Sequence, residues 1–88
     1  MNKEQAIEYW KNTKTNRWSK KNVQQVLKDI RSFKRTNKLS DEAVKIESFP
    51  NEMLRYRISF KNKVVFEALN GNHDYLVHYQ EDAFIKKA

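Results

Sequence analysis

Residues 19–36 read SKKNVQQVLKDIRSFKRT, and this stretch decides how the remaining segments can pack. Apolar side chains recur in it at steps of three and four residues, at Val23, Val26, Leu27, Ile30 and Phe33. This spacing predicts an amphipathic helix with one apolar stripe. Ser19 is the expected N-cap, Trp18 and Val23 have the spacing of a hydrophobic staple, and the helix is expected to end at Thr36-Asn37.

The side of this helix opposite the apolar stripe is cationic. It carries Lys21, Gln24, Lys28, Arg31 and Arg35, and no Pro or Gly interrupts the run. The stretch therefore predicts a helix that buries one face and presents a positively charged face to solvent.

A shorter helix is expected before it. Asn2 is its predicted N-cap with Gln5 as the capping-box partner, and Ile7 and Trp10 supply a short apolar edge. Residues 12–16 are polar, and their side chains compete for backbone hydrogen bonds, so this first helix should stop there and leave a loop.

The hydrophobic period changes to two in the second half of the chain. Residues 54–61 alternate apolar and basic side chains, residues 64–69 are mostly apolar, and residues 75–80 alternate again, which predicts three strands. Residues 61–63 form a tight connection, and Asn70-Gly71 is a turn signal because both residues tolerate positive φ.

Two shorter segments complete the prediction. Residues 42–47 alternate as a strand would, and a helix over residues 41–48 capped by Ser40 is the alternative. Glu81-Asp82 is expected to cap a short C-terminal helix. The predicted fold is a single α+β domain over residues 1–88, with two N-terminal helices packed on a three- to four-stranded antiparallel meander and a short C-terminal helix.

Composition excludes several classes of protein. The chain has no Cys, which removes disulfides and thiolate chemistry, and one Gly, which removes glycine-rich phosphate loops. His73 and His78 are the only histidines, and their spacing on a strand would put them on opposite faces, so no metal and no cofactor are expected. No run of about 20 apolar residues is present, so a cytoplasmic protein without membrane contact is expected.

The net charge of +7 is unevenly distributed. Residues 1–40 hold eleven basic and three acidic side chains, whereas residues 41–88 hold seven basic and eight acidic ones. Such an asymmetry favours a polyanionic partner for the basic half, although Lys and Asn make up 22 of the 88 residues and an AT-rich genome would favour their codons. The expected binding residues are Lys14, Arg17, Lys20, Lys21, Lys28, Arg31, Arg35 and Lys38.

A second candidate site lies on the predicted sheet. Arg55 and Arg57 share a strand face, Lys63 follows, and His78 and Tyr79 lie near the end of the last strand. Cleavage of RNA requires stabilisation of a developing phosphorane charge and transfer of a proton from the 2′-OH, for which Arg, Lys, His and Tyr are suitable. The alternative is a solvated sheet face with cross-strand charge pairs.

The stretch RISFKNKVVFEA at residues 57–68, followed by His78-Tyr79, resembles the C-terminal half of RelE/YoeB-type bacterial toxins over about residues 54–80. That family places helices before an antiparallel sheet whose Arg, Lys, His and Tyr cut ribosome-bound mRNA. The resemblance implies a metal-independent endoribonuclease and an acidic neutralising protein as partner. Its site residues would be Arg55, Arg57, Lys63, His78 and Tyr79, with Lys63 where the family usually has Arg.

The sequence thus predicts a small basic nucleic-acid-binding protein that engages the phosphate backbone through a cationic helix face, with RNA favoured over DNA. The alternatives are a RelE-like ribonuclease toxin, and a phage or mobile-element inhibitor that docks on a host nucleoprotein complex or another acidic protein surface.

Overall fold

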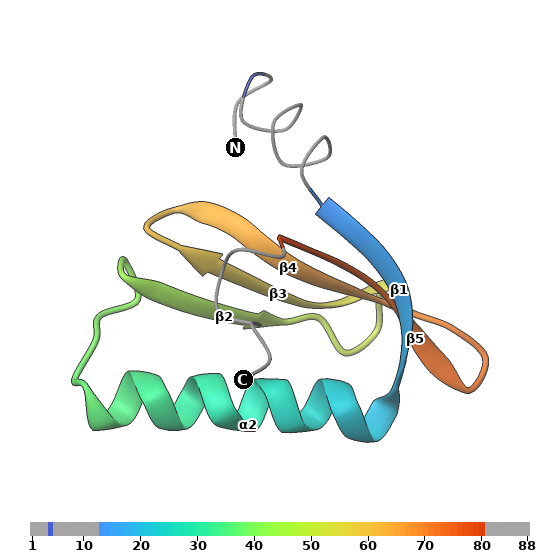
Figure 1. Cartoon of the computed structure of the whole chain (residues 1–88), viewed down its shortest axis with the longest axis horizontal. Coiled ribbons are helices and arrows are strands. Elements are labelled where there is room, and N and C mark those ends of the chain that lie inside the picture. The colour runs from blue at the N-terminus through green and yellow to red at the C-terminus, as the bar shows by residue number, and fades with distance from the viewer. Residues whose placement is uncertain (1–3, 5–12, 81–88) are drawn as a thin grey trace.

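The computed structural model describes residue 4 and residues 13–80, and these form one long helix against one sheet (Figure 1). The elements are β1 (Thr13–Ser19), α2 (Lys20–Thr36), β2 (Val44–Ser48), β3 (Leu54–Phe60), β4 (Lys63–Asn70) and β5 (Asp74–Gln80).

The sheet is antiparallel throughout, with the strand order β1-β5-β4-β3-β2. The two strands that flank α2 in sequence therefore lie at opposite edges, and α2 connects them across one face of the sheet (Figure 1). Five strands span about 19 Å between the edge strands, and 17 helical residues span about 26 Å, so a helix of this length can make the crossing.

The start of α2 forms as the sequence predicts. The backbone N–H of Asn22 donates to Ser19 Oγ over 3.1 Å, and Ser19 has the extended backbone of an N-cap. Val23, Leu27 and Ile30 are buried beneath the sheet and Val26 packs against the same core, as the predicted stripe requires. Phe33, its fifth predicted member, is instead 51% exposed. Trp18 also packs against this core, with its ring centroid 5.3 Å from that of Tyr79.

The end of α2 is a Schellman motif that closes on a non-glycine residue. The helix ends at Thr36 with Asn37 as C-cap, as predicted. Lys38 N–H donates to Arg35 O and Leu39 N–H donates to Lys34 O, which satisfies two carbonyls of the last turn. Lys38 adopts φ 53°, the left-handed conformation that this motif requires.

The predicted arrangement of two N-terminal helices on a three- to four-stranded meander is wrong. Within the described residues there is one long helix and a five-stranded sheet, because residues 13–19 form β1 instead of a loop. β1 pairs with β5 over seven positions, and this ladder outweighs the turn-forming preference of the Thr and Asn side chains. The helices predicted before residue 12 and after Glu81 lie outside the described residues.

The segment after α2 contains a turn and then a strand. Ser40 O accepts hydrogen bonds from the N–H groups of Ala43 and Val44, so residues 41–43 make one turn and do not continue as a helix. β2 follows and pairs with β3, with Ile46 opposite Ile58. Of the two predictions for residues 41–48, the strand is confirmed.

The hairpin turns use their residues differently from expectation. Lys61 and Asn62 both have positive φ, 50° and 66°, and join β3 to β4 as the predicted tight connection. Asn70 is still the last residue of β4 and pairs with Tyr75, so residues 71–73 connect the strands, and neither Asn70 nor Gly71 has the positive φ expected of it. Gly71 is needed for close approach instead, because a Cβ there would lie 2.7 Å from Asp74 Oδ1 and 2.8 Å from Asp74 O.

The core lies between α2 and the helix-facing side of the sheet. Its buried members are Val23, Leu27, Ile30, Val44, Ile58, Val65, Phe66, Ala68, Tyr75 and Val77. The other side of the sheet carries no described helix (Figure 1). No helix in the described part of the chain is both long and apolar enough to cross a membrane.

Candidate nucleic-acid interface

The eight basic residues predicted to bind a polyanion come from three neighbouring elements. Lys14 and Arg17 lie on β1, five more lie on α2, and Lys38 lies in the turn that ends α2; all eight are exposed. α2 itself carries six Lys or Arg residues and a single acid, Asp29. The structure therefore concentrates the predicted set on the helix.

Two of these cations already have partners near the start of α2. Arg17 Nη1 lies 3.0 Å from Asp74 Oδ1 in an ion pair that joins β1 to β5. Lys20 Nζ lies 5.8 Å from the centroid of the Tyr75 ring, in cation–π geometry. Both contacts hold these side chains at the β1 edge of the sheet. They leave less of the positive charge of Arg17 and Lys20 available to a ligand.

Five other cations form what we call the cationic stripe: Lys21, Lys28, Arg31, Arg35 and Lys38. None of them is paired with a carboxylate of the described residues. The four on α2 lie within roughly a quarter of the helix circumference and extend over about 21 Å of its axis. Asp29 is about a third of a turn away and accepts a hydrogen bond from Gln25 Nε2.

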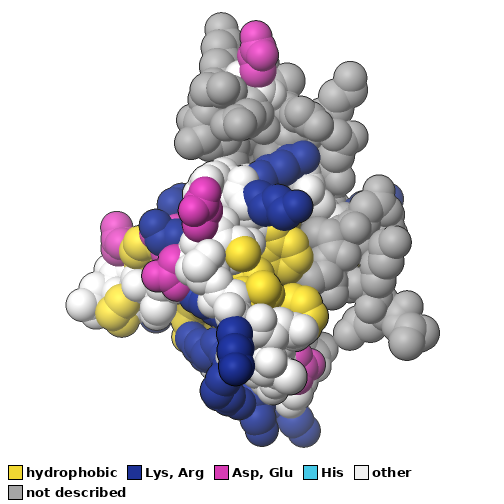
Figure 2. Space-filling view, turned by 90° about the vertical axis from the view of Figure 1, so that its left-hand side faces the viewer, with side chains coloured by type: hydrophobic (Ala, Val, Ile, Leu, Met, Phe, Trp, Pro, Cys, Tyr) yellow, Lys and Arg dark blue, Asp and Glu magenta, His cyan; other side chains and the backbone are white. Residues whose placement is uncertain are grey.

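The stripe is densest at the C-terminal end of α2. In Figure 2, Lys and Arg side chains gather at the bottom of the face that this end of the helix presents. Several acidic side chains lie at the left of that view among other Lys and Arg side chains, one lies at the lower right, and hydrophobic side chains are exposed near the centre. The charge separation read from the sequence is thus partial in space, because Asp41 from the second half of the chain pairs with Lys34 at this end of α2.

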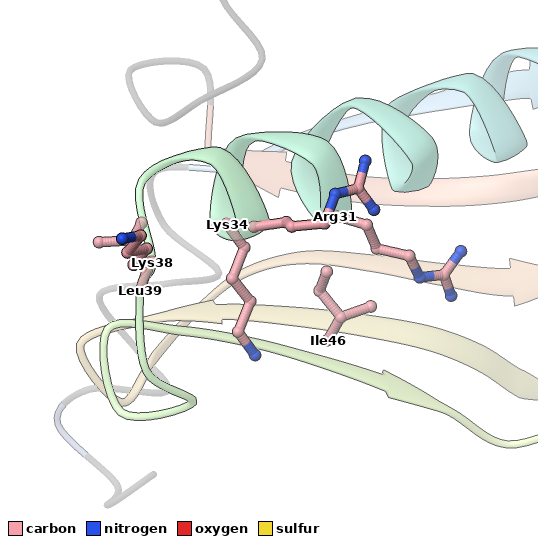
Figure 3. Close-up of a pocket in the computed structure, with 6 residues that line it drawn as sticks. Arg31, Lys34, Lys38, Leu39 and Ile46 are labelled. Carbon is pink, nitrogen blue, oxygen red and sulfur yellow. The ribbon is translucent and has the colours of Figure 1, made fainter.

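A shallow groove of about 420 Å³ lies between this end of α2 and β2 (Figure 3). Its lining consists of four cations and two aliphatic side chains: Arg31, Lys34, Arg35, Lys38, Leu39 and Ile46. Lys34 forms an ion pair with Asp41, and this hydrogen-bonded lysine lowers the pKa of the Asp41 carboxyl from 3.8. We call this feature the basic groove.

Sequence reasoning missed three members of the groove. Lys34 follows Arg31 by three residues, so helical spacing alone places it on the same flank. Leu39 and Ile46 had no such signal, because their positions depend on the Schellman motif and on the edge placement of β2.

Aromatic hydroxyls lie beside the first half of the helix. Gln24 Nε2 donates to the Tyr56 hydroxyl over 3.0 Å, and the Tyr56 and Tyr75 rings meet edge to face with centroids 5.9 Å apart. Burial raises the pKa of Tyr75 above its usual value of 10.0, and the nearby Tyr56 adds to this effect. Tyr75 therefore remains neutral at physiological pH, and the hydrogen bond from Gln24 to Tyr56 ties α2 to β3.

The sheet face away from α2 carries a row of polar side chains across all five strands. Register places Arg57 opposite Glu47 and Glu67, Glu67 opposite His78, and His78 opposite Thr15. Arg57 Nε donates to Glu67 Oε2 over 3.0 Å, and its guanidinium carbon lies 5.7 Å from the centroid of the Phe49 ring. Arg57 is therefore held by a carboxylate and an aromatic ring.

The five predicted catalytic residues do not come together at one point. His78 Nδ1 lies 2.9 Å from Thr15 Oγ1 on the open sheet face, in the same row as Arg57. Tyr79 lies on the opposite face, where its hydroxyl accepts from Asn16 Nδ2 and its ring packs on Trp18. Lys63 is opposite Phe60 at the start of β4, and Arg55 Nε donates to Glu52 O.

The two histidines are also separated. The sequence suggested that both histidines lie on one strand. His78 is within β5, but His73 lies in the turn that precedes this strand. Among the residues that the structure describes, no three His, Asp or Glu side chains gather as metal ligands would.

Comparisons of the chain with protein families, with curated proteins and with solved structures find no match. The resemblance to RelE/YoeB-type toxins over residues 54–80 therefore stays a prediction from the sequence.

Proposed function

We propose that this protein binds nucleic acid through the phosphate backbone, with the cationic stripe on α2 as its contact surface. The observation that carries the proposal is the row of exposed Lys and Arg side chains that no described carboxylate neutralises. Release of counterions from a polyanion on contact with such a row is a favourable, sequence-independent driving force.

The remaining side chains of α2 favour backbone contacts over base reading. Gln and Asn are the residues that pair with adenine edges in a DNA groove. Gln24 is hydrogen-bonded to Tyr56, and Gln25 to Asp29, so both glutamines of the helix are occupied by other contacts. Recognition by charge and shape is the expected mode.

RNA is the preferred nucleic acid in this proposal. RNA can be recognised by contacts to its phosphates and to its 2′-hydroxyls, which distinguish it from DNA in single strands as well as in helices. A stripe made of Lys and Arg donors matches that mode, and a stronger affinity for RNA than for DNA of the same length is the expected outcome.

The placement of the five candidate catalytic residues supports binding over cleavage. Arg57, the strand-face arginine of the ribonuclease interpretation, is in contact with Glu67, and Tyr79 lies on the face opposite His78. Glu67, bonded to Arg57 Nε, already neutralises this charge, and its carboxylate would repel a phosphate that approached the guanidinium.

The test is a matched pair of charge reversals. Arg31→Glu with Arg35→Glu removes two charges of the stripe, and Lys45→Glu with Lys61→Glu makes the same change in net charge on exposed residues outside it. The stripe variant should lose more than about tenfold in affinity for a short RNA, and the control variant should lose far less. Equal losses from both pairs, or no binding by the unaltered protein, would overturn the proposal. Binding of an acidic protein in place of RNA would also overturn it.

A further inference from the structure

The basic groove combines two kinds of surface that a duplex backbone cannot use together. Its lining combines four cations, which we call the rim, with the aliphatic side chains of Leu39 and Ile46, which we call the floor. Phosphates of a duplex would reach the rim, but paired bases are stacked inside the helix and would leave the apolar floor exposed. A ligand that covers both surfaces must carry a negative charge beside an uncharged planar or apolar group.

The groove is formed by well-anchored backbone. Leu39 is fixed by the hydrogen bond from its N–H to Lys34 O over 2.9 Å, in the Schellman motif. Ile46 is within β2, opposite the fully buried Ile58. Figure 3 shows Ile46 on the strand below α2, with Lys34 extending from the helix toward the same strand. A site on such elements is largely preformed.

The charges at the rim are available to an anion. Lys34 is engaged with Asp41, but Arg31, Arg35 and Lys38 have no carboxylate partner among the described residues. The C-terminal end of a helix repels anions through its dipole. Here two of its last carbonyls accept hydrogen bonds from Lys38 and Leu39, and three exposed cations surround them, so the local field favours an anion.

We propose that the basic groove binds an unpaired nucleotide, with its phosphates on Arg31, Arg35 and Lys38 and the face of its base on Leu39 and Ile46. Unpaired bases expose a flat face that stacks on aromatic rings or on an Arg guanidinium plane, and burial of this face against aliphatic side chains removes apolar surface from water in the same way. The proposal rests on the function proposed above and adds to it the form of nucleic acid. The protein selects single-stranded or overhanging segments over blunt duplexes.

The experiment measures the affinity of the protein for three oligonucleotides that share one strand of the same length. They are this strand alone, its blunt duplex, and a duplex in which one end of the strand is unpaired. The variant Leu39→Ser with Ile46→Thr removes apolar floor and keeps every charge. Because it loses apolar area that the base would cover, this variant should lose about tenfold in affinity for the single strand and the overhang, and little for the blunt duplex. Met53→Thr, at an exposed apolar residue outside the groove, is the matched control. RNA and DNA versions of the overhang show whether the sugar contributes.

The outcomes separate the two proposals. If neither the single strand nor the duplex binds the unaltered protein, the nucleic-acid function itself is wrong. If the single strand and the duplex both bind, and the floor variant lowers the affinity for both equally or for neither, the function stands and the groove proposal is wrong. Displacement of the overhang by an acidic peptide of equal charge, at a lower concentration than by the single strand, would assign the groove to a protein partner and overturn it.

A second measurement does not depend on the folding of any variant. A photoreactive thiouridine in the unpaired end, irradiated with the unaltered protein, should cross-link within residues 38–46, where Lys38, Leu39 and Ile46 lie. Cross-links confined to other segments would contradict the placement of the base.

Discussion

At Lys38 the backbone conformation favours glycine, whereas the positive charge of the basic groove favours lysine. The φ of 53° at Lys38 is one that glycine adopts without cost and that a side chain with a Cβ adopts at a penalty. Glycine is also the usual residue at this position of a Schellman motif. A lysine here contributes a positive charge to the basic groove at the expense of fold stability.

Replacement of Lys38 by Gly should therefore raise stability and weaken binding. We expect a gain of about 0.5–1 kcal/mol in the free energy of unfolding, read from urea denaturation. The affinity for RNA should fall in the same variant. Lys38→Asn is the intermediate control, because Asn tolerates this conformation better than Lys but carries no charge. A loss of stability in Lys38→Gly would contradict the assignment of this turn.

Asp41 predicts a pH dependence at the same end of α2. Its hydrogen bond and ion pair with Lys34 lower its pKa in the folded protein below 3.8. An acid with a depressed folded-state pKa stabilises the fold above its unfolded pKa, and this contribution is lost as the pH falls through the folded value.

Substitution Asp41→Asn should thus lower the melting temperature at pH 7 and have little effect at a pH well below 3.8. The difference should be small, because the side chain is exposed and the pair is screened by salt. Melting curves of both proteins across this range test it, and a constant difference at all pH values would show that the ion pair is not its cause.

At the scale of elements, α2 was predictable and β1 was not. The helix has a periodic apolar stripe and an N-cap, and both signals are local, so they survive in any tertiary context. β1 has Thr, Lys and Asn where a buried strand has apolar residues, and Trp18 is its only described side chain in or against the core. Its strand conformation comes from pairing with β5, about sixty residues later, and no local pattern encodes that contact.

The N-cap of α2 makes a testable contribution to stability. Ser19→Ala leaves the N–H of Asn22 without its 3.1 Å acceptor and should cost about 1 kcal/mol in the free energy of unfolding. Ser19→Asp retains an acceptor and adds a negative charge at the positive end of the helix dipole, so it should preserve stability. Equal destabilisation by both substitutions would mean that Ser19 acts through its pairing in β1 and not as a cap.

At the scale of the whole molecule, the basic half of the sequence supplies the exposed cations of α2, and the other half supplies most of the sheet, where charges of both signs occur. The cationic stripe faces solvent without a described carboxylate partner, whereas Glu67 pairs with Arg57 on the open sheet face and Asp74 pairs with Arg17. The sequence identified the stripe because helical spacing reports which side chains share a face. The basic groove needed the three-dimensional placement of β2 beside the end of α2, which depends on the strand order.

The candidate ribonuclease residues show what sequence reasoning could not predict about the sheet. His78 and Tyr79 entered the candidate set because both lie near the end of the last predicted strand and because the RelE/YoeB resemblance pairs them. Within a strand, neighbours point to opposite faces, so only His78 joins Arg57 on the open side.

The most direct test of the central claim is the salt dependence of RNA binding. If the stripe neutralises phosphates, a plot of log affinity against log salt concentration should be linear with a slope of about −3 to −4. Neutralisation of Arg31 and Arg35 together to Gln should reduce the magnitude of this slope by about two. A slope near zero, or one that these substitutions leave unchanged, would contradict the account.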